Sequence, residues 1–349
     1  MRYLRLWLIA LGCVCTGFVW GQNNSYEVLS VAFYNVENLF DTQNDPKTRD
    51  DDRTPEGRDR WTEDLYRKKV ANIAKVLAQI GQDTTNEAPA VIGLSEVENR
   101  AVIEALVQDP ALKPYNYGII HVDSPDERGI DVALIYQKKR FLPIAFKNHA
   151  LRLYRKNGTR DYTRDHLLVH GLLEQEPIYF IVNHWPSRSG GQKRSEPGRI
   201  KAAALTKKLA DSIFSLNPKA KLINMGDFND DPIDKSVAKV LEATDNKRLA
   251  LRKKQLFNPM TAFYKQGVGT ACYRGTWNML DQVHVSAGLL RKKKSGWRFW
   301  KAGIYNKAFM INQDGRYKGY PYRSFAGGRF LGGYSDHFPV YAYLVRKMN

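Results

Sequence analysis

Short apolar runs that end in polar turn residues recur along the chain, and each run has the length of a β-strand. The clearest run is 222–225, Leu-Ile-Asn-Met, which Gly226 and Asp227 follow directly. An apolar run that stops at glycine and aspartate predicts a buried strand with a tight polar turn at its end. The same reasoning predicts strands at 28–34, 90–94, 117–122, 130–136, 142–146, 166–173, 179–182, 282–285 and 338–345.

Helical periodicity appears between these strands. Thr62 precedes apolar residues at helical spacing and Gly81 follows them, so the pattern predicts a helix over 62–80. A longer helix is predicted over 198–214, and a short one after Pro232. The sequence shows no internal repeat, low-complexity tract or linker. It therefore predicts one α/β domain in which two packed sheets and their helices form layers.

The first 21 residues differ from the rest of the chain. A short basic start precedes an apolar stretch over 6–20, which is too short to cross a bilayer comfortably. The chain turns polar after Gly21, and this arrangement is typical of a secretory signal peptide. We therefore expect a signal peptide over 1–21 and export of the domain 22–349 to the periplasm or the extracellular medium. A retained N-terminal anchor is the alternative.

The net charge of the chain limits the classes of partner that it is expected to bind. The formal net charge is +18, and it stays strongly positive when the signal peptide is removed. So basic a surface favours an anionic partner, which is nucleic acid, an anionic lipid headgroup or a polyphosphate. A protein that is basic without an anionic partner is the alternative, and charge alone does not separate the two.

The cysteine count limits the metal chemistry. Cys13 and Cys15 leave with the signal peptide, so Cys272 is the single cysteine of the mature chain. This excludes an intramolecular disulfide and a thiolate metal cluster. Any metal must bind to oxygen or imidazole ligands, which favours Mg²⁺, Mn²⁺ or Ca²⁺.

Chemically capable side chains stand where the apolar strands end. They are Asn35, Glu96, His184, Asp227, Asn229, Asp281, Asp336 and His337. If these strand ends meet, they form an oxygen-ligand metal site, a carboxylate–imidazole pair and a set of donors for an anion. For the segment 226–229, an ordinary turn at a strand end is the alternative. Asp131 heads an apolar strand, where it either faces the site or caps the strand.

Six short segments stand in a fixed order: Tyr34–Asn38, Leu94–Glu96, Asn183–His184, Gly226–Asn229, Leu280–Val283 and Ser335–Val340. This ordered set resembles the endonuclease/exonuclease/phosphatase superfamily, the DNase I-like group. Within that group, Asn35–Asp41 together with Glu96–Asn99 resembles the secreted bacterial nuclease-like branch. The six segments follow the family order and span nearly all of the mature chain. The resemblance implies a four-layered α/β sandwich of two mostly antiparallel sheets flanked by helices, with the site at one edge of both sheets.

The resemblance also implies a role for each residue. Asn35, Glu96 and Asp336 would hold a divalent metal, which would be Mg²⁺, with Mn²⁺ or Ca²⁺ as alternatives. Asp227 would orient or deprotonate the attacking water, and Asn229 would bind the phosphate. His337 would pair with Asp281. His184 would donate to a phosphate oxygen or protonate the leaving group. Arg188 is expected to bind substrate. Ser95 and Gln282 depart from the usual family residues, which bears on substrate fit.

Three functions remain open at this point. The first is a secreted metal-dependent endonuclease acting on DNA or RNA as a monomer without a protein partner. The second is a phosphoesterase acting on phospholipids or sugar phosphates, because the segment 291–300 mixes Lys and Arg with aromatic residues and suits an anionic membrane surface as well as nucleic acid. A hairpin is predicted near 297–304. The alternative to a binding role is that its Trp and Phe side chains pack inward and its Lys side chains are only solvated. The third is a surface protein that binds nucleic acid without cutting it.

Overall fold

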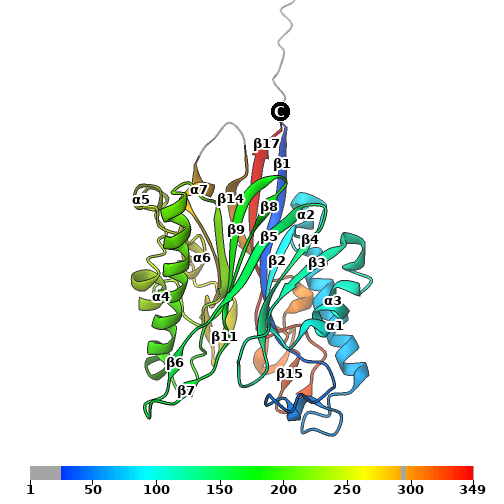
Figure 1. Cartoon of the computed structure of the whole chain (residues 1–349). Coiled ribbons are helices and arrows are strands. Elements are labelled where there is room, and N and C mark those ends of the chain that lie inside the picture. The colour runs from blue at the N-terminus through cyan, green and yellow to red at the C-terminus, as the bar shows by residue number, and fades with distance from the viewer. Residues whose placement is uncertain (1–24, 292–295, 349) are drawn as a thin grey trace, which may run out of the picture.

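Two β-sheets pack face to face at the centre of the computed structural model, which describes residues 25–291 and 296–348 (Figure 1). The six-stranded sheet has the order β14 (Arg298–Ile304), β17 (Val340–Lys347), β1 (Tyr26–Leu39), β2 (Val91–Val97), β4 (Asp131–Gln137), β3 (Tyr117–His121). The five-stranded sheet has the order β13 (Asp281–Val285), β10 (Leu222–Asp227), β9 (Glu176–His184), β8 (His166–Leu173), β5 (Phe141–His149). The predicted signal peptide 1–21 lies outside the described residues.

Helices cover the outer face of each sheet (Figure 1). The six-stranded sheet carries α1 (Glu63–Gln79), α2 (Gln82–Thr85) and α3 (Arg100–Gln108). The remaining helices all follow β9 in the chain. They are α4 (Gln192–Leu216), the π-helix η3 (Ser236–Val240), α5 (Lys247–Lys253), α6 (Met260–Lys265) and α7 (Ala287–Leu290). Among the described residues, we find no helix with the length and apolar character needed to cross a membrane.

The connections contain short elements. They are the 3₁₀ turns η1 (Asp51–Arg53), η2 (Lys113–Tyr115), η4 (Ala308–Met310) and η5 (Gly315–Tyr317), and the paired strands β6 (Leu153–Tyr154) with β7 (Arg160–Asp161), β11 (Ala271–Tyr273) with β12 (Thr276–Asn278), and β15 (Phe325–Ala326) with β16 (Arg329–Phe330).

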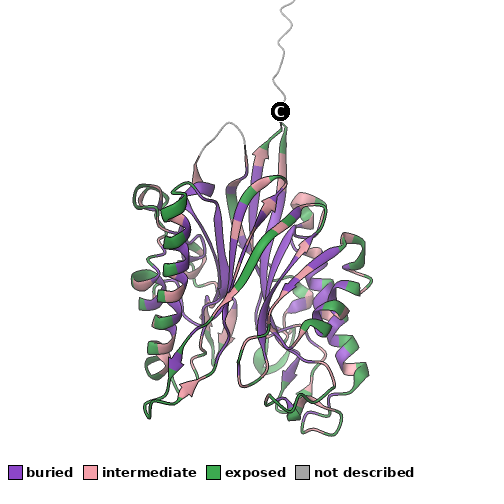
Figure 2. Ribbon diagram, viewed as in Figure 1, coloured by how far each residue is buried: buried purple, intermediate pink, exposed green. Residues whose placement is uncertain are grey.

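Three apolar cores separate four layers. Side chains alternate along a strand. Val31 and Phe33 of β1 therefore enter the core between the two sheets, whereas Ala32 and Tyr34 enter the core between the six-stranded sheet and α1. A third core lies between the five-stranded sheet and α4. The central strands are therefore buried on both faces and the helices on one, whereas the edge strand β5 is largely exposed, as Figure 2 shows. The predicted four-layered α/β sandwich with mostly antiparallel sheets is confirmed.

Strand direction gathers the polar strand ends. β1 and β2 are parallel, with Asn35 opposite Ser95, and β9 and β10 are parallel, with His184 opposite Asp227. Parallel neighbours end at the same edge of a sheet, so each sheet collects its functional residues at one edge. Antiparallel β13 begins at that edge and adds Asp281, which pairs in register with Asp227.

Two predicted elements differ in the structure. The segment predicted as a hairpin is the single strand β14, which pairs with β17. Trp297 and Phe299 are buried in the core because they lie on the inward face, and only Trp300 is largely exposed. The long helix starts at Gln192 rather than at 198, because the buried guanidinium of Arg199 donates to the Gln192 carbonyl and holds the first turns.

Candidate active site

The edges of the two sheets meet at a buried amide–carboxylate contact. Asn35 of β1 donates from Nδ2 to Oδ2 of Asp227 on β10 over 3.0 Å. Both side chains are buried, and the two residues are 192 positions apart in the chain. The Asn35 Oδ1 atom accepts a hydrogen bond from the backbone N–H of Glu37. Hydrogen bonds to both Nδ2 and Oδ1 therefore orient the Asn35 amide, which links the edge of one sheet to the edge of the other.

Glu96 reaches this contact through an irregularity of β2. The register shifts between Ser95 and Val97, and Glu96 has a φ of 63°, a backbone conformation that costs free energy for a side-chain-bearing residue. Its Oε2 accepts from the backbone N–H of Asn38 over 3.0 Å. Burial opposes the negative charge, but the cations Arg128 and His337 hold the pKa of Glu96 below its ordinary value. Glu96 is therefore ionised at neutral pH.

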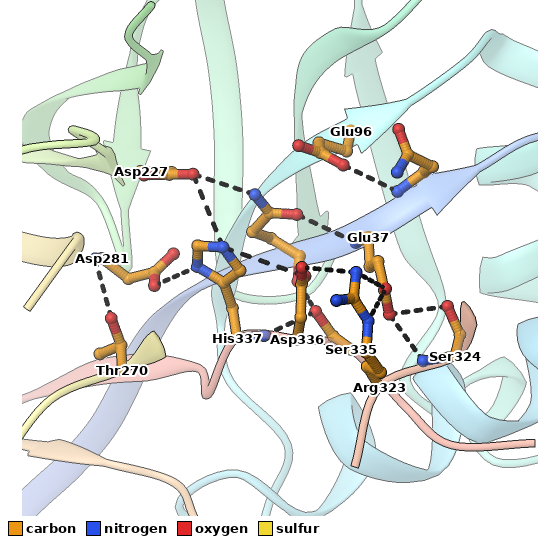
Figure 3. A network of polar contacts seen from close by, with 12 residues as sticks. Glu37, Glu96, Asp227, Thr270, Asp281, Arg323, Ser324, Ser335, Asp336 and His337 are labelled. Atoms are coloured by element: carbon orange, nitrogen blue, oxygen red, sulfur yellow. Dashed lines mark hydrogen bonds and ion pairs between the residues drawn. The ribbon is translucent and has the colours of Figure 1, made fainter. Parts of the chain in front are cut away.

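His337 is paired with a fully buried carboxylate, as Figure 3 shows. Its Nδ1 atom lies 2.6 Å from Asp281 Oδ2, and its Nε2 atom lies 4.0 Å from Asp227 Oδ2. Burial disfavours the charged imidazole, but the charges of Asp281 and Asp227 outweigh it and raise the pKa of His337 well above its ordinary value. The ring is therefore an imidazolium that donates Nδ1–H to Asp281 and directs Nε2–H toward Asp227.

His184 lies between the two sheets and is neutral. Its Nε2 atom is 3.7 Å from Glu96 Oε1 and 3.6 Å from Asp227 Oδ2. Burial, together with nearby arginine charges, holds the pKa of His184 well below its ordinary value. Burial also raises the pKa of Asp227 to about 6. The two imidazoles therefore differ in charge, with the positive one on the Asp281 side.

Asp336 stands at the rim of this group. Its side chain is 37% exposed, and Oδ1 lies 3.9 Å from Nε2 of His337. Its Oδ2 atom accepts from Nη2 of Arg323 over 3.1 Å. The structure thus brings Asn35, Glu96, His184, Asp227, Asp281, Asp336 and His337 together at one edge.

A supporting network holds the β1 turn, and sequence reasoning missed most of it. The carboxylate of Glu37 accepts from Arg323 Nε at 3.0 Å and from the backbone N–H and hydroxyl of Ser324. Lys69 of α1 donates to the Glu37 and Asn38 carbonyls, and burial lowers the pKa of Lys69 to about 8. Glu37 and Asn38 both have positive φ, so these contacts stabilise the strained backbone that follows Asn35.

Asn229 and Arg188 bind to protein groups. The Asn229 backbone N–H donates to Asp227 Oδ1, and its Nδ2 donates to the Trp185 carbonyl over 3.0 Å. This is the turn that the sequence left as the alternative for 226–229. Arg188 donates to the Asn229 carbonyl and to the carboxylates of Asp231 and Asp234. Two of the three side chains predicted to bind substrate, Asn229 and Arg188, are therefore hydrogen-bonded within this loop.

Asp131 belongs to a neighbouring cluster. It accepts from the backbone N–H of Ser124 and pairs with His121 Nε2 at 2.9 Å. Asp131 therefore caps the turn before β4, which is one of the two alternatives that the sequence left open for this residue.

Arg128 is a residue that the sequence did not single out: its Nη2 atom lies 3.9 Å from Glu96 Oε1. No sequence signal separates this arginine from the many other surface cations.

Comparison with known proteins decides the family. The endonuclease/exonuclease/phosphatase family model matches residues 30–346. The chain belongs to this family. A comparison with curated protein sequences gave no significant match. Members of the endonuclease/exonuclease/phosphatase family are metal-dependent phosphoester hydrolases, and this chain is a phosphoesterase of that kind.

Solved structures share the fold of this family member. A family protein from Bacteroides thetaiotaomicron is 16% identical with a TM-score of 0.54, covering 93% of this chain and 100% of that one. D. rerio TDP2, in complex with a single-stranded DNA product, is 14% identical with a TM-score of 0.53, covering 91% and 98%. The mannosyl-6-phosphatase of B. thetaiotaomicron VPI-5482 is 16% identical with a TM-score of 0.53, covering 90% and 99%. At these identities the likeness concerns the fold alone.

The donor set fits the divalent metal that the family requires. Asn35, Glu96 and Asp336 offer amide and carboxylate oxygens, which are the ligands that Mg²⁺ prefers. The carboxylate of Glu96 is ionised, and Asp227 and Asp281 add further negative charge at the same edge. The ligand atoms of Asp227, Asp281 and His337 lie within 4.8 Å of one another, but His337 and Asp281 are hydrogen-bonded to each other. The ligand set of Asn35, Glu96 and Asp336 expected from the sequence therefore stays a prediction that the chemistry of these residues fits.

Proposed function

We propose that this chain is an exported, divalent-metal-dependent phosphodiesterase that cuts nucleic acid internally. The observation that carries the chemistry is the buried His337–Asp281 pair facing Asp227, beside the oxygen ligands Asn35 and Glu96. The net charge of +18 supports a polyanionic substrate. Export rests on the signal peptide expected over 1–21.

The oxygen-bearing side chains of the site have two roles, metal binding and proton acceptance. Asn35, Glu96 and Asp336 would hold Mg²⁺, which neutralises charge on the phosphate when bound. Asp227, oriented by Asn35, accepts a proton from the attacking water. The water oxygen bonds to phosphorus as the bond from phosphorus to the leaving oxygen breaks, and the leaving oxygen takes a proton from solvent.

The two histidines serve the phosphate in different ways. The His337 imidazolium donates Nε2–H to a phosphate oxygen, with its ring fixed by Asp281. His184 is neutral, so it acts as a hydrogen-bond donor to the phosphate rather than as a strong acid.

A nicking assay tests this function. The mature chain 22–349 is incubated with supercoiled plasmid, single-stranded DNA and RNA, with Mg²⁺ or with EDTA. We expect Mg²⁺-dependent cleavage of at least one substrate and its loss in His337→Ala. Intact substrates in all three incubations, with a folded protein, would reject a nuclease. Tight binding without turnover in Mg²⁺ and Mn²⁺ would instead indicate a non-catalytic binding protein.

A lipid phosphoesterase is the second candidate, favoured by an apolar row on the edge strand β5. Leu142, Ile144 and Phe146 are 62%, 57% and 53% exposed, and Figure 2 shows this stretch as solvent-facing. Exposed apolar residues of this kind are found at membrane-contacting surfaces. Release of phosphate or a phosphorylated headgroup from anionic liposomes, without plasmid nicking, would favour this candidate.

A further inference from the structure

A basic cleft opens beside the active site. It has a volume of about 820 Å³ and lies between the β6–β7 pair and the first turns of α4. Five of its lining side chains are cationic, and one, Asp161, is a carboxylate. A cleft with this charge favours a ligand that carries several negative charges.

The floor of the cleft is continuous with the active site. Arg164 lines the cleft, is buried, and donates from Nη2 to the Trp185 carbonyl over 2.8 Å. The same carbonyl accepts the side-chain amide of Asn229, and Trp185 directly follows His184. Arg164 also donates to Asp126 over 2.9 Å, which holds it in place. Arg164 therefore connects the lining of the cleft to the backbone of the residue that follows His184.

Two tyrosines give the cleft exposed aromatic surface. Tyr154 and Tyr162 line it and are 56% and 49% exposed. The guanidinium of Arg160 lies 5.9 Å and 5.4 Å from the two ring centroids, so both rings are held by the same cation. Aromatic rings that are fixed in place and open to solvent are platforms on which nucleic-acid bases stack.

Three cations of the cleft have no acidic partner. Lys156, Arg194 and Lys201 are exposed, and among the residues that the structure describes none has a carboxylate within ion-pair distance. Arg155, in contrast, is paired with Glu127 and Asp161. The cations without a carboxylate partner lie on both walls, since Lys156 follows β6 while Arg194 and Lys201 lie on α4. Lys201 also places its ammonium 6.0 Å from the centroid of the Tyr154 ring.

We propose that this cleft binds the single-stranded segment of nucleic acid that continues from the scissile phosphate. Bases stack on Tyr154 and Tyr162, and successive phosphates pair with Lys156, Arg194 and Lys201. The presence of exposed rings together with cations that have no carboxylate partner favours a strand with unpaired bases over a lipid headgroup, which has no base to stack. The inference rests on the proposed function and specifies its substrate.

Binding without metal tests the cleft separately from the chemistry. The mature chain in EDTA is titrated into a fluorescein-labelled oligothymidylate of about 12 nucleotides, and anisotropy is followed at several salt concentrations. For the double variant Lys156→Glu, Arg194→Glu we expect affinity to fall at least about tenfold and the salt dependence to become shallower. Tyr154→Ala should weaken binding by about fivefold or more, whereas Tyr154→Phe retains the stacking surface and should restore it.

The matched control carries the same change of charge far from the cleft. Arg248→Glu with Arg252→Glu on α5, at the opposite end of α4 in Figure 1, should bind within about twofold of the parent protein. An equal loss in both double variants, or none in the cleft variant, would overturn the proposal. So would equally tight binding of a duplex of the same length.

A separate hydrolysis assay distinguishes failure of the proposed function from failure of the cleft assignment. Hydrolysis of bis(p-nitrophenyl) phosphate by the parent protein with Mg²⁺ reports the chemistry without using the cleft. A parent that binds the oligothymidylate through the cleft but does not hydrolyse this ester would refute the phosphodiesterase and leave the cleft assignment intact. Anionic liposomes that compete with the oligothymidylate for the cleft would redirect the assignment to a membrane surface.

Discussion

Asn35 and Asp227 join the two sheets through one hydrogen bond of 3.0 Å between an amide and a carboxylate. Asp227→Asn keeps the volume of the side chain but removes its ability to accept a proton. We expect kcat for a phosphodiester to fall by about 10²–10⁴, the contribution of a positioned general base. Thermal unfolding followed by circular dichroism serves as the control, and an active Asp227→Asn enzyme would show that another group accepts the proton.

His337 and Asp281 should act as a unit. The imidazole needs the Asp281 carboxylate to keep its charge and orientation, so His337→Ala and Asp281→Asn should each lower kcat by about 10²–10³. The double variant should be little worse than either single variant, because the second change removes a partner that has nothing left to orient. Kinetics of the four proteins on one substrate measure this coupling, and independent, multiplying losses would contradict it.

Arg323 should tune the metal site without contacting substrate. It bridges Glu37 and Asp336, so Arg323→Gln should loosen one proposed ligand and the turn that follows another. Supporting residues of metal sites typically contribute about 10–100-fold in metal affinity. We expect the Mg²⁺ concentration for half-maximal activity to rise by that factor, with most activity regained at saturating Mg²⁺. A loss of kcat that Mg²⁺ does not restore would assign Arg323 a different role.

His166 should make the fold sensitive to acid. It is fully buried, hydrogen-bonded to the Ala202 carbonyl, and burial lowers its pKa to about 3. Between the ordinary pKa of 6.5 and this value, the unfolded chain binds a proton that the folded chain does not. The free energy of unfolding therefore falls as pH decreases through this window, by about 1.4 kcal/mol per pH unit for this group.

The measurement compares the parent protein with His166→Gln, which keeps a side-chain donor but does not titrate. Urea unfolding between pH 4 and pH 6.5, on the order of five pH values, gives both slopes. The variant should show a shallower dependence by about one proton. Parallel curves would mean that His166 is charged in the folded protein.

The catalytic end of the fold was predictable because strand ends carry their own sequence signal. Asp227 follows an apolar run and a glycine, and parallel pairing of β9 and β10 then places it beside His184. Asn35 and Glu96 follow the same rule in the other sheet. The pattern marked these residues and the family resemblance implied that they meet; the parallel pairing seen in the structure supplies the physical reason, since parallel neighbours end at the same edge of a sheet.

The supporting residues were not predictable from local pattern. Lys69 is a lysine in an amphipathic helix, and nothing in its neighbours indicates that its ammonium enters the core to hold two carbonyls 31 and 32 residues away. Arg188 resembled a substrate-binding cation, but the acids that occupy it lie more than 40 residues further along the chain. Such partners are fixed by tertiary packing, which periodicity does not encode.

The junction of the two sheets also sets when the protein becomes active during its biosynthesis. Asn35 and Glu96 come from the first sheet, His184 and Asp227 from the second, and His337 from the segment just before the final strand β17. A nascent chain lacks part of this set until synthesis is almost complete, and a chain held unfolded for transport has none of it assembled. For the exported nuclease proposed here, this latency would protect the nucleic acids of the cell that makes it.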